Sequence, residues 1–328
     1  MRKNNVKITV IGLGYVGLPL AIEFSKYFSV VGFDLDVTRI KELKNGHDRT
    51  KELTKNQLQN ISNLIFTSDL KKIKDSNVYI ITVPTPVNKN NIPDLEPLKK
   101  ASSMVGALLK KNDLVIYEST VFPGATEKIC IPILEKESDL KYKSEFFCGY
   151  SPERINPGDK KHSLHNTIKI TSGCNKKTSE FVNWLYNRIV TVGTHLVESI
   201  EIAEAAKVIE NVQRDVNIAL MNELAIIFNK LGLDTEKVLD AASTKWNFLP
   251  FRPGLVGGHC IGVDPYYMAH KAKLLKVKSE LILGGRKIND KMAIYTGKKF
   301  LQHLNKKNRS TKTKKVLIMG VTFKENCP

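Results

Sequence analysis

A glycine-rich turn near the N-terminus constrains the fold of this chain most strongly. Gly12, Gly14 and Gly17 follow a buried-strand pattern at residues 7–11 and precede a helical pattern at residues 20–26. In a G-x-G-x-x-G turn the first glycine permits a tight bend, the second lets the backbone approach a pyrophosphate, and the third lets the helix pack closely on the strand. The turn therefore predicts a dinucleotide site at the start of a βαβ unit.

An acidic residue supports this prediction and specifies the dinucleotide. Asp34 directly follows the next strand pattern, at residues 30–33. A carboxylate there can accept hydrogen bonds from the adenosine ribose and would repel a 2′-phosphate, which favours NAD over NADP. The alternative is that Asp34 only caps the end of a strand. Arg39 could line the adenine side of the same site or be a surface arginine.

Later apolar runs continue the alternation of strands and helices. Residues 78–83 and 114–117 are rich in β-branched and aromatic residues. The alternation predicts a parallel sheet covered by helices. Pro84 and Thr85 end the first of these strands and Thr120 follows the second, at the sheet edge where ligands of open α/β sheets bind.

The pattern changes near residue 195. From residue 196 to about residue 231 apolar residues recur at helical spacing without a proline, which predicts one long helix joining two domains. Gly232 can cap its end, and Asp234 can cap a short helix beginning near Thr235. Further helices are expected to about residue 304, followed by a polar, basic linker.

The last residues resemble the start of another unit. Residues 316–319 read as the first strand of a second Rossmann-like sheet, and the chain stops at Pro328 before such a sheet could form. We therefore expect an α/β fold in three parts. These are a Rossmann-like NAD-binding domain with a parallel sheet at 1–195, a long central helix and helical domain at 196–305, and a linker with the truncated start of a second Rossmann-like domain at 306–328.

Composition limits the remaining function classes. The 328 residues carry a formal net charge of +18, but the lysines are scattered, which favours a solvated surface over a nucleic-acid site. No apolar run is long enough to span a bilayer, and the N-terminus lacks a signal-peptide pattern, so we expect no membrane contact and a cytoplasmic location. Five scattered cysteines without a CxxC pair predict neither a disulfide framework nor a metal site.

Three segments carry candidate reactive groups. Cys260 follows a glycine-rich loop and precedes Asp264, so it could be a nucleophile or a small buried side chain. Lys207 and Asn211 lie four residues apart and so share a helix face, either as functional groups or as a solvated polar stripe. Glu153, in a loop after an aromatic strand, could face the ligand edge or be merely exposed.

Six stretches, in this order, resemble the UDP-glucose/GDP-mannose dehydrogenase family over essentially the whole chain. They are GLGYVGLP at 12–19, ESTVFPG at 118–124, SPER at 151–154, AKVIENVQRDVNIALMNE at 206–223, GLVGGHCIGVD at 254–264 and GVTFKENCP at 320–328. The helix stretch and residues 245–267 are most similar to the UDP-N-acetylhexosamine 6-dehydrogenase branch, which includes the UDP-N-acetylglucosamine and UDP-N-acetylgalactosamine enzymes.

The resemblance implies an enzyme of surface-polysaccharide precursor synthesis that oxidises a sugar C6 to the carboxylate with NAD. Cys260 would form a thiohemiacetal and then a thioester. Lys207 and Asp264 would handle the C6 oxygen and its proton, and Asn211 a water or the oxyanion. Glu153 would be the base for hydrolysis, and Thr120 would position water and the nicotinamide.

The turn pattern and the resemblance together define two ligand sets and an assembly. The cofactor set is Gly12, Gly14, Tyr15, Val16, Gly17, Asp34, Arg39, Pro84, Thr85 and Thr120. The substrate set, for a UDP-sugar, is Glu153, Arg154, Ile155, Lys207, Asn211, Arg214, Arg252, Gly257 and Lys324. The family likeness also implies a homodimer or a higher homo-oligomer.

Three alternatives stay open at this point. UDP-glucose or UDP-N-acetylmannosamine could be the substrate. A two-electron dehydrogenase of the 3-hydroxyacid type has a similar layout, although it needs no cysteine. Because the family continues into a domain that holds the UDP, the chain could also be an NAD-binding but catalytically incompetent protein that binds UDP-sugar weakly.

Overall fold

The computed structural model describes residues 3–59, 61–155, 164–258, 261–307 and 315–319. The chain divides into two compact units, which are described separately. Unit 1 is built mainly from Met1–Asn88 and Pro93–Lys207, and unit 2 mainly from Val208–Phe323.

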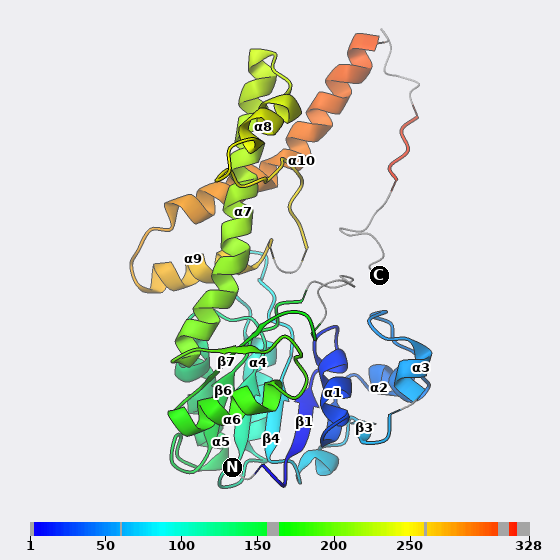
Figure 1. Cartoon of the computed structure of the whole chain (residues 1–328), viewed down its shortest axis with the longest axis vertical. Helices are drawn as coiled ribbons and strands as arrows, with labels where there is room; N and C mark the ends of the chain where they lie inside the picture. Colours follow the sequence, from blue (N-terminus) through cyan, green and yellow to red (C-terminus); the bar gives the residue numbers. More distant parts are fainter. Residues whose placement is uncertain (1–2, 60, 156–163, 259–260, 308–314, 320–328) are drawn as a thin grey trace. The chain divides into compact units, whose positions relative to one another are not determined.

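Unit 1 contains an eight-stranded sheet with the order β3-β2-β1-β4-β5-β6-β7-β8 (Figure 1). Every neighbouring pair is parallel except β6 and β7, which are antiparallel. The predicted parallel sheet is therefore confirmed for six strands, while β7 and β8 run in the opposite direction. The strands are β1 (Lys7–Ile11), β2 (Ser29–Phe33), β3 (Leu64–Thr67), β4 (Val78–Ile81), β5 (Leu114–Tyr117), β6 (Phe147–Tyr150), β7 (Lys169–Gly173) and β8 (Thr194–Leu196).

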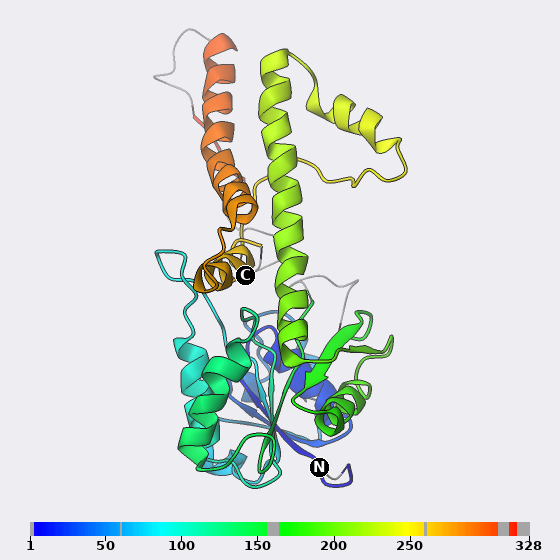
Figure 2. The same cartoon turned by 90° about the vertical axis from the view of Figure 1, so that its left-hand side faces the viewer.

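The central strands are apolar throughout because helices cover both faces of the sheet. All four residues of β4 and of β5 are buried. Helices α1 (Gly17–Ser25) and α6 (Lys176–Tyr186) share one face, where the rings of Phe24 and Tyr186 meet edge to face at 5.5 Å. Helices α4 (Glu96–Gly106) and α5 (Ile131–Ser138) pack together on the other face (Figure 2).

Short elements complete unit 1, and side-chain caps fix the start of two of its helices. The carboxylate of Asp36 accepts the N–H groups of Thr38 and Arg39 at the start of α2 (Val37–Lys44), and Asn175 accepts the N–H of Thr178 at the start of α6. Such caps satisfy backbone donors that the first helical turn leaves unpaired. The remaining elements are α3 (Lys55–Gln59), the 3₁₀ turn η1 (Leu70–Ile73) and the π-helical turn η2 (Thr126–Cys130).

The predicted long helix is confirmed as α7 (Ile200–Leu231), with 32 residues that begin in unit 1 and continue into unit 2. Its predicted start at residue 196 is wrong. Leu196 belongs to β8, where it pairs with Thr171 of β7. Pairing with a distant strand therefore outweighs the local helical pattern, and the Ser199 hydroxyl accepts the N–H of Ile202 as the helix begins.

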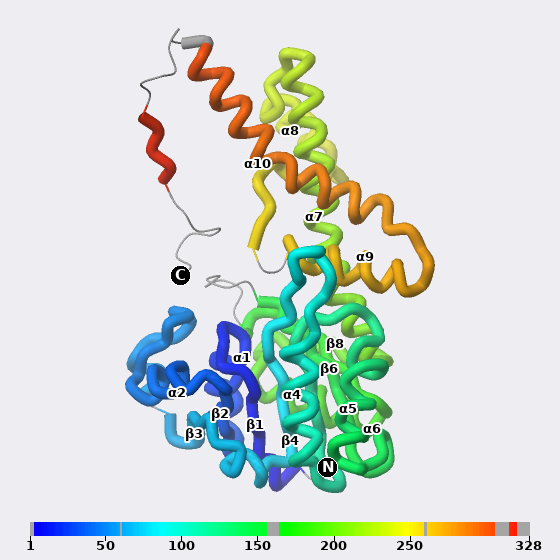
Figure 3. Tube along the Cα trace, turned by 180° about the vertical axis from the view of Figure 1, so that it is seen from behind, coloured from blue at the N-terminus to red at the C-terminus, as the bar shows by residue number. Residues whose placement is uncertain are grey.

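The described part of unit 2 contains three further helices, α8 (Thr235–Ser243), α9 (Asp264–Leu274) and α10 (Glu280–Lys307), which Figure 3 follows along the chain. The predicted cap is confirmed, because the Asp234 carboxylate accepts the N–H groups of Glu236 and Lys237. Within the described residues, no helix has both the length and the hydrophobicity to cross a membrane.

Residues 316–319, predicted as the first strand of a further Rossmann-like unit, are not paired with any described segment. These residues have no regular structure, and the exposed fractions of Val316, Leu317, Ile318 and Met319 lie between 55% and 86%. A strand is stabilised by hydrogen bonds to a neighbouring strand, and no described segment pairs with this one.

Candidate cofactor and active site

The glycine loop of unit 1 has the geometry that a dinucleotide requires. Gly12 lies in the left-handed region with φ of +93°, and a Cβ there would be 3.1 Å from the Thr82 carbonyl oxygen. A Cβ on Gly17, the first residue of α1, would lie 1.9 Å from the Gly12 oxygen. A Cβ on Gly14 would meet open space, and Val16 at the N-cap supplies no side-chain hydrogen bond. The start of α1 therefore fits a pyrophosphate.

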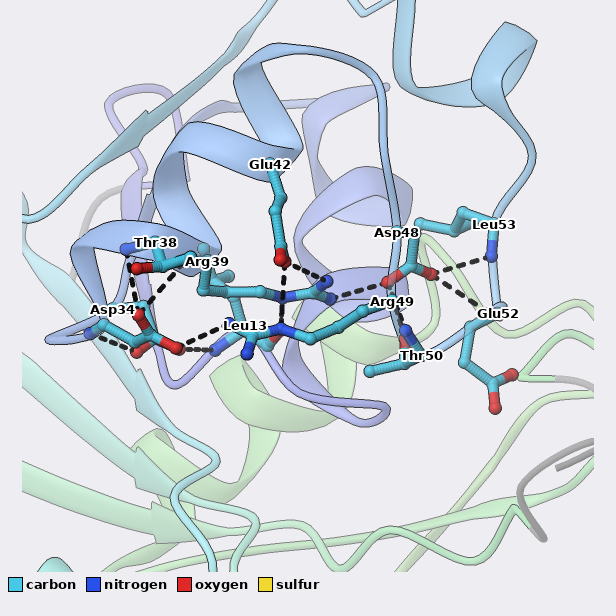
Figure 4. Close-up of polar contacts among 11 residues, drawn as sticks. Leu13, Asp34, Thr38, Arg39, Glu42, Asp48, Arg49, Thr50, Glu52 and Leu53 are labelled. Carbon is cyan, nitrogen blue, oxygen red and sulfur yellow. Dashed lines mark hydrogen bonds and ion pairs between the residues drawn. The ribbon is translucent and has the colours of Figure 1, made fainter. Parts of the chain in front are cut away.

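The Asp34 carboxylate ties this loop to the end of β2 (Figure 4). Its Oδ2 accepts the Leu13 N–H at 2.7 Å, and its Oδ1 accepts the Asp36 N–H at 2.9 Å. Asp34 therefore does more than cap a strand. Each carboxylate oxygen has two lone pairs, so each can also accept a ribose hydroxyl.

Arg39 braces the same loop from the other side. Its Nε donates to the Leu13 carbonyl at 2.9 Å, and a terminal nitrogen donates to Asp48 at 2.7 Å. Because Arg39 is only 3% exposed, the alternative of a surface arginine is wrong. Asp48 also accepts backbone N–H groups from Thr50 and Leu53, so it organises the following loop. A contact of Arg39 with the adenine stays a prediction.

The strand-end residues lie in neighbouring loops at the carboxyl edge of the sheet. Pro84 and Thr85 follow β4, and Thr120 follows β5. The Ser119 hydroxyl donates to the Val83 carbonyl at 2.6 Å, which holds the two loops together. The edge that the sequence predicted as a ligand site is therefore built from both loops.

Glu153, in the loop after β6, is bound inward. Its Oε1 accepts the N–H groups of Arg154 and Ile155, both at 2.7 Å, and its Oε2 lies 3.5 Å from the Lys169 ammonium. The side chain is 13% exposed. The alternative of a freely exposed loop glutamate is therefore wrong.

Lys169 is the centre of a buried ionic network that the sequence did not reveal. Its ammonium lies 2.8 Å from Glu118, and the Tyr186 hydroxyl donates to the other oxygen of Glu118. Burial raises the pKa of Glu118, and Lys169 opposes that effect. Burial lowers the pKa of Lys169, but the carboxylates of Glu118 and Glu153 outweigh it, and its pKa lies above the ordinary value. Glu118 lies 51 residues from Lys169, so no local pattern could join them.

A cavity of about 700 Å³ in unit 1 brings the two predicted ligand sets together. Tyr15 and Val16 of the cofactor set and Glu153 and Ile155 of the substrate set are among its lining residues. The volume lies in the range that holds small ligands and cofactors.

In unit 2, Asn211 donates a hydrogen bond of 2.5 Å to Asp264. Asn211 and Asp264 are 4% and 2% exposed, and Lys207, which lies one turn earlier on α7 in the part of the helix that belongs to unit 1, is 7% exposed. The alternative of a solvated polar stripe is therefore wrong for these residues. Asp264 is also the first residue of α9, where the helix dipole stabilises a negative charge.

The two predicted substrate arginines of unit 2 differ in their surroundings. Arg214 is half-buried on α7. Arg252 pairs with Asp240 at 2.7 Å and with Glu236 at 3.7 Å, both on α8. A substrate phosphate would therefore have to compete with two carboxylates for the Arg252 guanidinium.

The segment that leads to the predicted nucleophile is anchored at its start. The Asn222 amide donates to the Gly254 carbonyl at 3.0 Å and accepts the Gly254 N–H at 2.9 Å. Gly257 lies in an exposed loop, and a Cβ there would meet open space. Cys260 and Lys324 lie outside the described residues.

Comparison with known proteins assigns the family. The sequence profile of the UDP-glucose/GDP-mannose dehydrogenase NAD-binding domain matches residues 6–190, and that of the central domain of the same family matches residues 201–291. The chain belongs to the UDP-glucose/GDP-mannose dehydrogenase family. It is an NAD-dependent nucleotide-sugar dehydrogenase, as the sequence predicted.

Individual members of this family are similar over nearly the whole chain. The UDP-N-acetyl-D-glucosamine 6-dehydrogenase of Pseudomonas aeruginosa is 56% identical over 324 residues, which are 99% of this chain and 77% of that protein. The Salmonella typhi protein of the same name is 57% identical over 99% of this chain and 76% of its own length. The structure of UDP-D-ManNAc dehydrogenase from Pyrococcus horikoshii has a TM-score of 0.85 at 34% identity, covering 92% of this chain and 72% of that one. The predicted fold class is thereby confirmed.

Proposed function

We propose that this chain oxidises C6 of UDP-N-acetylglucosamine to the carboxylate, for the synthesis of surface-polysaccharide precursors. The relatives at 56% and 57% identity are both UDP-N-acetyl-D-glucosamine 6-dehydrogenases, which supports this substrate over UDP-N-acetylgalactosamine, UDP-N-acetylmannosamine and UDP-glucose. The observation that carries the chemistry is the buried Asn211–Asp264 pair, one helical turn from Lys207.

The proposed reaction removes four electrons in two steps. Bound NAD supplies the hydride acceptor for each oxidation. The first oxidation converts the C6 alcohol to an aldehyde, and the Cys260 thiolate then adds to C6 to form a thiohemiacetal. The second oxidation of this adduct gives a thioester, and water displaces the Cys260 sulfur to release the carboxylate. Covalent attachment is reasonable because the tetrahedral adduct carries a transferable hydride and the aldehyde is not released.

The proposed roles of the other residues follow from their charge and surroundings. The Lys207 ammonium would stabilise negative charge developing on the C6 oxygen. Asp264, fixed by Asn211, would exchange the proton of that oxygen. Glu153 would take a proton from the hydrolytic water, and its two backbone hydrogen bonds and Lys169 restrict its rotation.

We also propose a role for each of the three predicted domains. Residues 1–195 would bind NAD, residues 196–305 would carry substrate and dimer contacts, and residues 306–328 would lead into a UDP-binding part. Homodimeric assembly and a cytoplasmic location stay predictions.

The test is the stoichiometry of NADH formation with a panel of UDP-sugars. We expect two NADH per uronate, the highest kcat/KM with UDP-N-acetylglucosamine, and no net oxidation by Cys260→Ser. Lys207→Ala should lower kcat about 10²- to 10³-fold, as for loss of an oxyanion donor, and leave NAD binding intact. One NADH per sugar with accumulation of free aldehyde would instead support a two-electron dehydrogenase.

A further inference from the structure

A second layer of charges surrounds Asp34, the carboxylate expected to face the adenosine ribose. It consists of two arginines and three acidic residues, and we call it the arginine bracket (Figure 4). Its members are Arg39, Asp48, Arg49, Asp36 and Glu42.

Arg39 cannot turn toward a ligand without breaking a buried ion pair. The side chains of Arg39 and Asp48 are 4% and 0% exposed, and a terminal nitrogen of Arg39 lies 2.7 Å from the Oδ1 of Asp48. The Arg39 Nε is also bound to the Leu13 carbonyl. Removing one partner of such a pair leaves a buried charge without compensation, which is strongly unfavourable.

Arg49 is accessible, but two carboxylates hold it. Its side chain is 44% exposed, a terminal nitrogen lies 2.5 Å from Asp36, and its Nε lies 2.9 Å from Glu42. The hydrogen bond to Asp36 raises the pKa of Arg49, so the guanidinium stays charged. Asp36 in turn donates its N–H to Asp34, which places Arg49 close to the ribose-facing carboxylate.

Sites that bind NADP use an arginine in this region to accommodate the 2′-phosphate. We propose that Asp36 and Glu42 are specificity-determining residues, which exclude NADP by keeping the Arg49 guanidinium away from the ribose. Asp48 does the same for Arg39. Together with Asp34, the bracket has four carboxylates and two guanidiniums, so the residues around the ribose carry a net negative charge that repels a further phosphate.

The variant Asp34→Ser distinguishes the arginine bracket from Asp34 acting alone. If Asp34 were the sole determinant, Asp34→Ser would bind NADP about as well as NAD. With the arginine bracket intact, Asp34→Ser weakens NAD binding and gains no NADP binding. The inference rests on NAD as the cofactor and does not depend on the identity of the sugar.

The experiment is titration calorimetry with NAD, NADP and 2′,5′-ADP, the last being a probe of the phosphorylated adenosine half. The variant Asp34→Ser/Asp36→Asn/Glu42→Gln releases Arg49, and its asparagine would preserve the cap of α2 because asparagine caps helices as well as aspartate does. We expect it to bind NADP and 2′,5′-ADP at least about tenfold more tightly than Asp34→Ser, as for one charge-assisted hydrogen bond to phosphate. Addition of Arg49→Met is the matched control and should abolish the gain.

Two results would overturn the inference while wild-type protein still prefers NAD. One is NADP binding by Asp34→Ser that equals that of the triple variant, and the other is a gain that persists with Arg49→Met. If the triple variant does not fold, Asp34→Ser/Glu42→Gln keeps Asp36 and should show a smaller gain, of about threefold; no gain there would also overturn the inference. Wild-type protein that binds NADP as tightly as NAD would refute the cofactor assignment as well.

Discussion

Replacing Lys169 with methionine would leave the Glu118 carboxylate buried with no cation beside it. The side chains of Lys169 and Glu118 are 4% and 0% exposed, so water cannot screen the charge. Removing one partner of a buried ion pair typically costs about 3–5 kcal/mol. We therefore expect Lys169→Met to destabilise unit 1 by an amount in this range at pH 8.

The pH dependence of that loss has a defined sign. Burial already raises the pKa of Glu118 above its value in the unfolded chain, and loss of Lys169 would raise it further. A carboxyl group with a raised pKa stabilises the folded state at low pH, and this contribution is lost as the pH rises through the folded-state pKa. The destabilisation by Lys169→Met should therefore be smaller at pH 5 than at pH 8, by up to about 1.4 kcal/mol for each pH unit over which Glu118 titrates.

Urea unfolding followed by tryptophan fluorescence would measure the loss in unit 1. Trp184 packs against Phe28 and Phe181, with ring centroids 5.9 Å and 5.4 Å away, whereas Trp246 of unit 2 is 92% exposed. A Trp246→Phe background would therefore isolate the signal of unit 1.

The matched control for this prediction removes the buried charge together with its partner. Lys169→Met/Glu118→Gln should recover most of the stability, since glutamine can still accept from the Tyr186 hydroxyl. A loss that is equal in the single and double variants, or that does not change with pH, would refute the reasoning.

Two further predictions concern stability and cofactor binding. Burial raises the pKa of Glu204 to about 7, so its contribution to stability is present below about pH 4.5 and lost as the pH rises through about 7, an effect of about 3 kcal/mol. Glu204→Gln should flatten the pH dependence of Tm between pH 5 and 8, and an unchanged slope would show that another group titrates. Gly17→Ala should disrupt the turn itself, because its Cβ would lie 1.9 Å from the Gly12 oxygen, whereas Gly14→Ala should fold normally and lose NAD affinity. Equal circular-dichroism spectra and equal NAD affinities for these two variants would contradict that distinction.

The sequence predicted those features that depend on neighbouring residues. Four such features are the glycine turn, the apolar strands, the helical spacing of α7 and the Asp234 cap. Each depends only on residues close to one another in the sequence, and the structure contains all four. Features that depend on distant partners were missed. The first residues after 195 follow a helical pattern, yet the pairing of Leu196 with Thr171 places Leu196 in a strand, and the helix begins only at Ile200.

The same distinction applies to the candidate site. Asp34 and Glu153 could be selected because each follows a strand at the predicted ligand edge. Lys169 could not be selected, since a lysine at the start of a strand is ordinary until the fold places Glu118 beside it. Asp48 could not be selected either, because its ion pair with Arg39 forms only when α2 and the following loop are folded.

The reversed direction of β7 makes the site sensitive to insertions and deletions. Gly149 pairs with Gly173 and Tyr150 with Ser172, so the antiparallel register, continued past the strand, sets Glu153 opposite Lys169. The parallel strands end at the carboxyl edge of the sheet, whereas β7 begins there. Its first residue, Lys169, therefore lies at the same edge as the last residues of the parallel strands. A shift of one residue in this pairing turns every side chain of a strand to the opposite face. Loss or gain of a single residue within β7, between Lys169 and Ser172, would therefore displace Lys169 from Glu153 and act on the site, although no residue of the site would have been replaced.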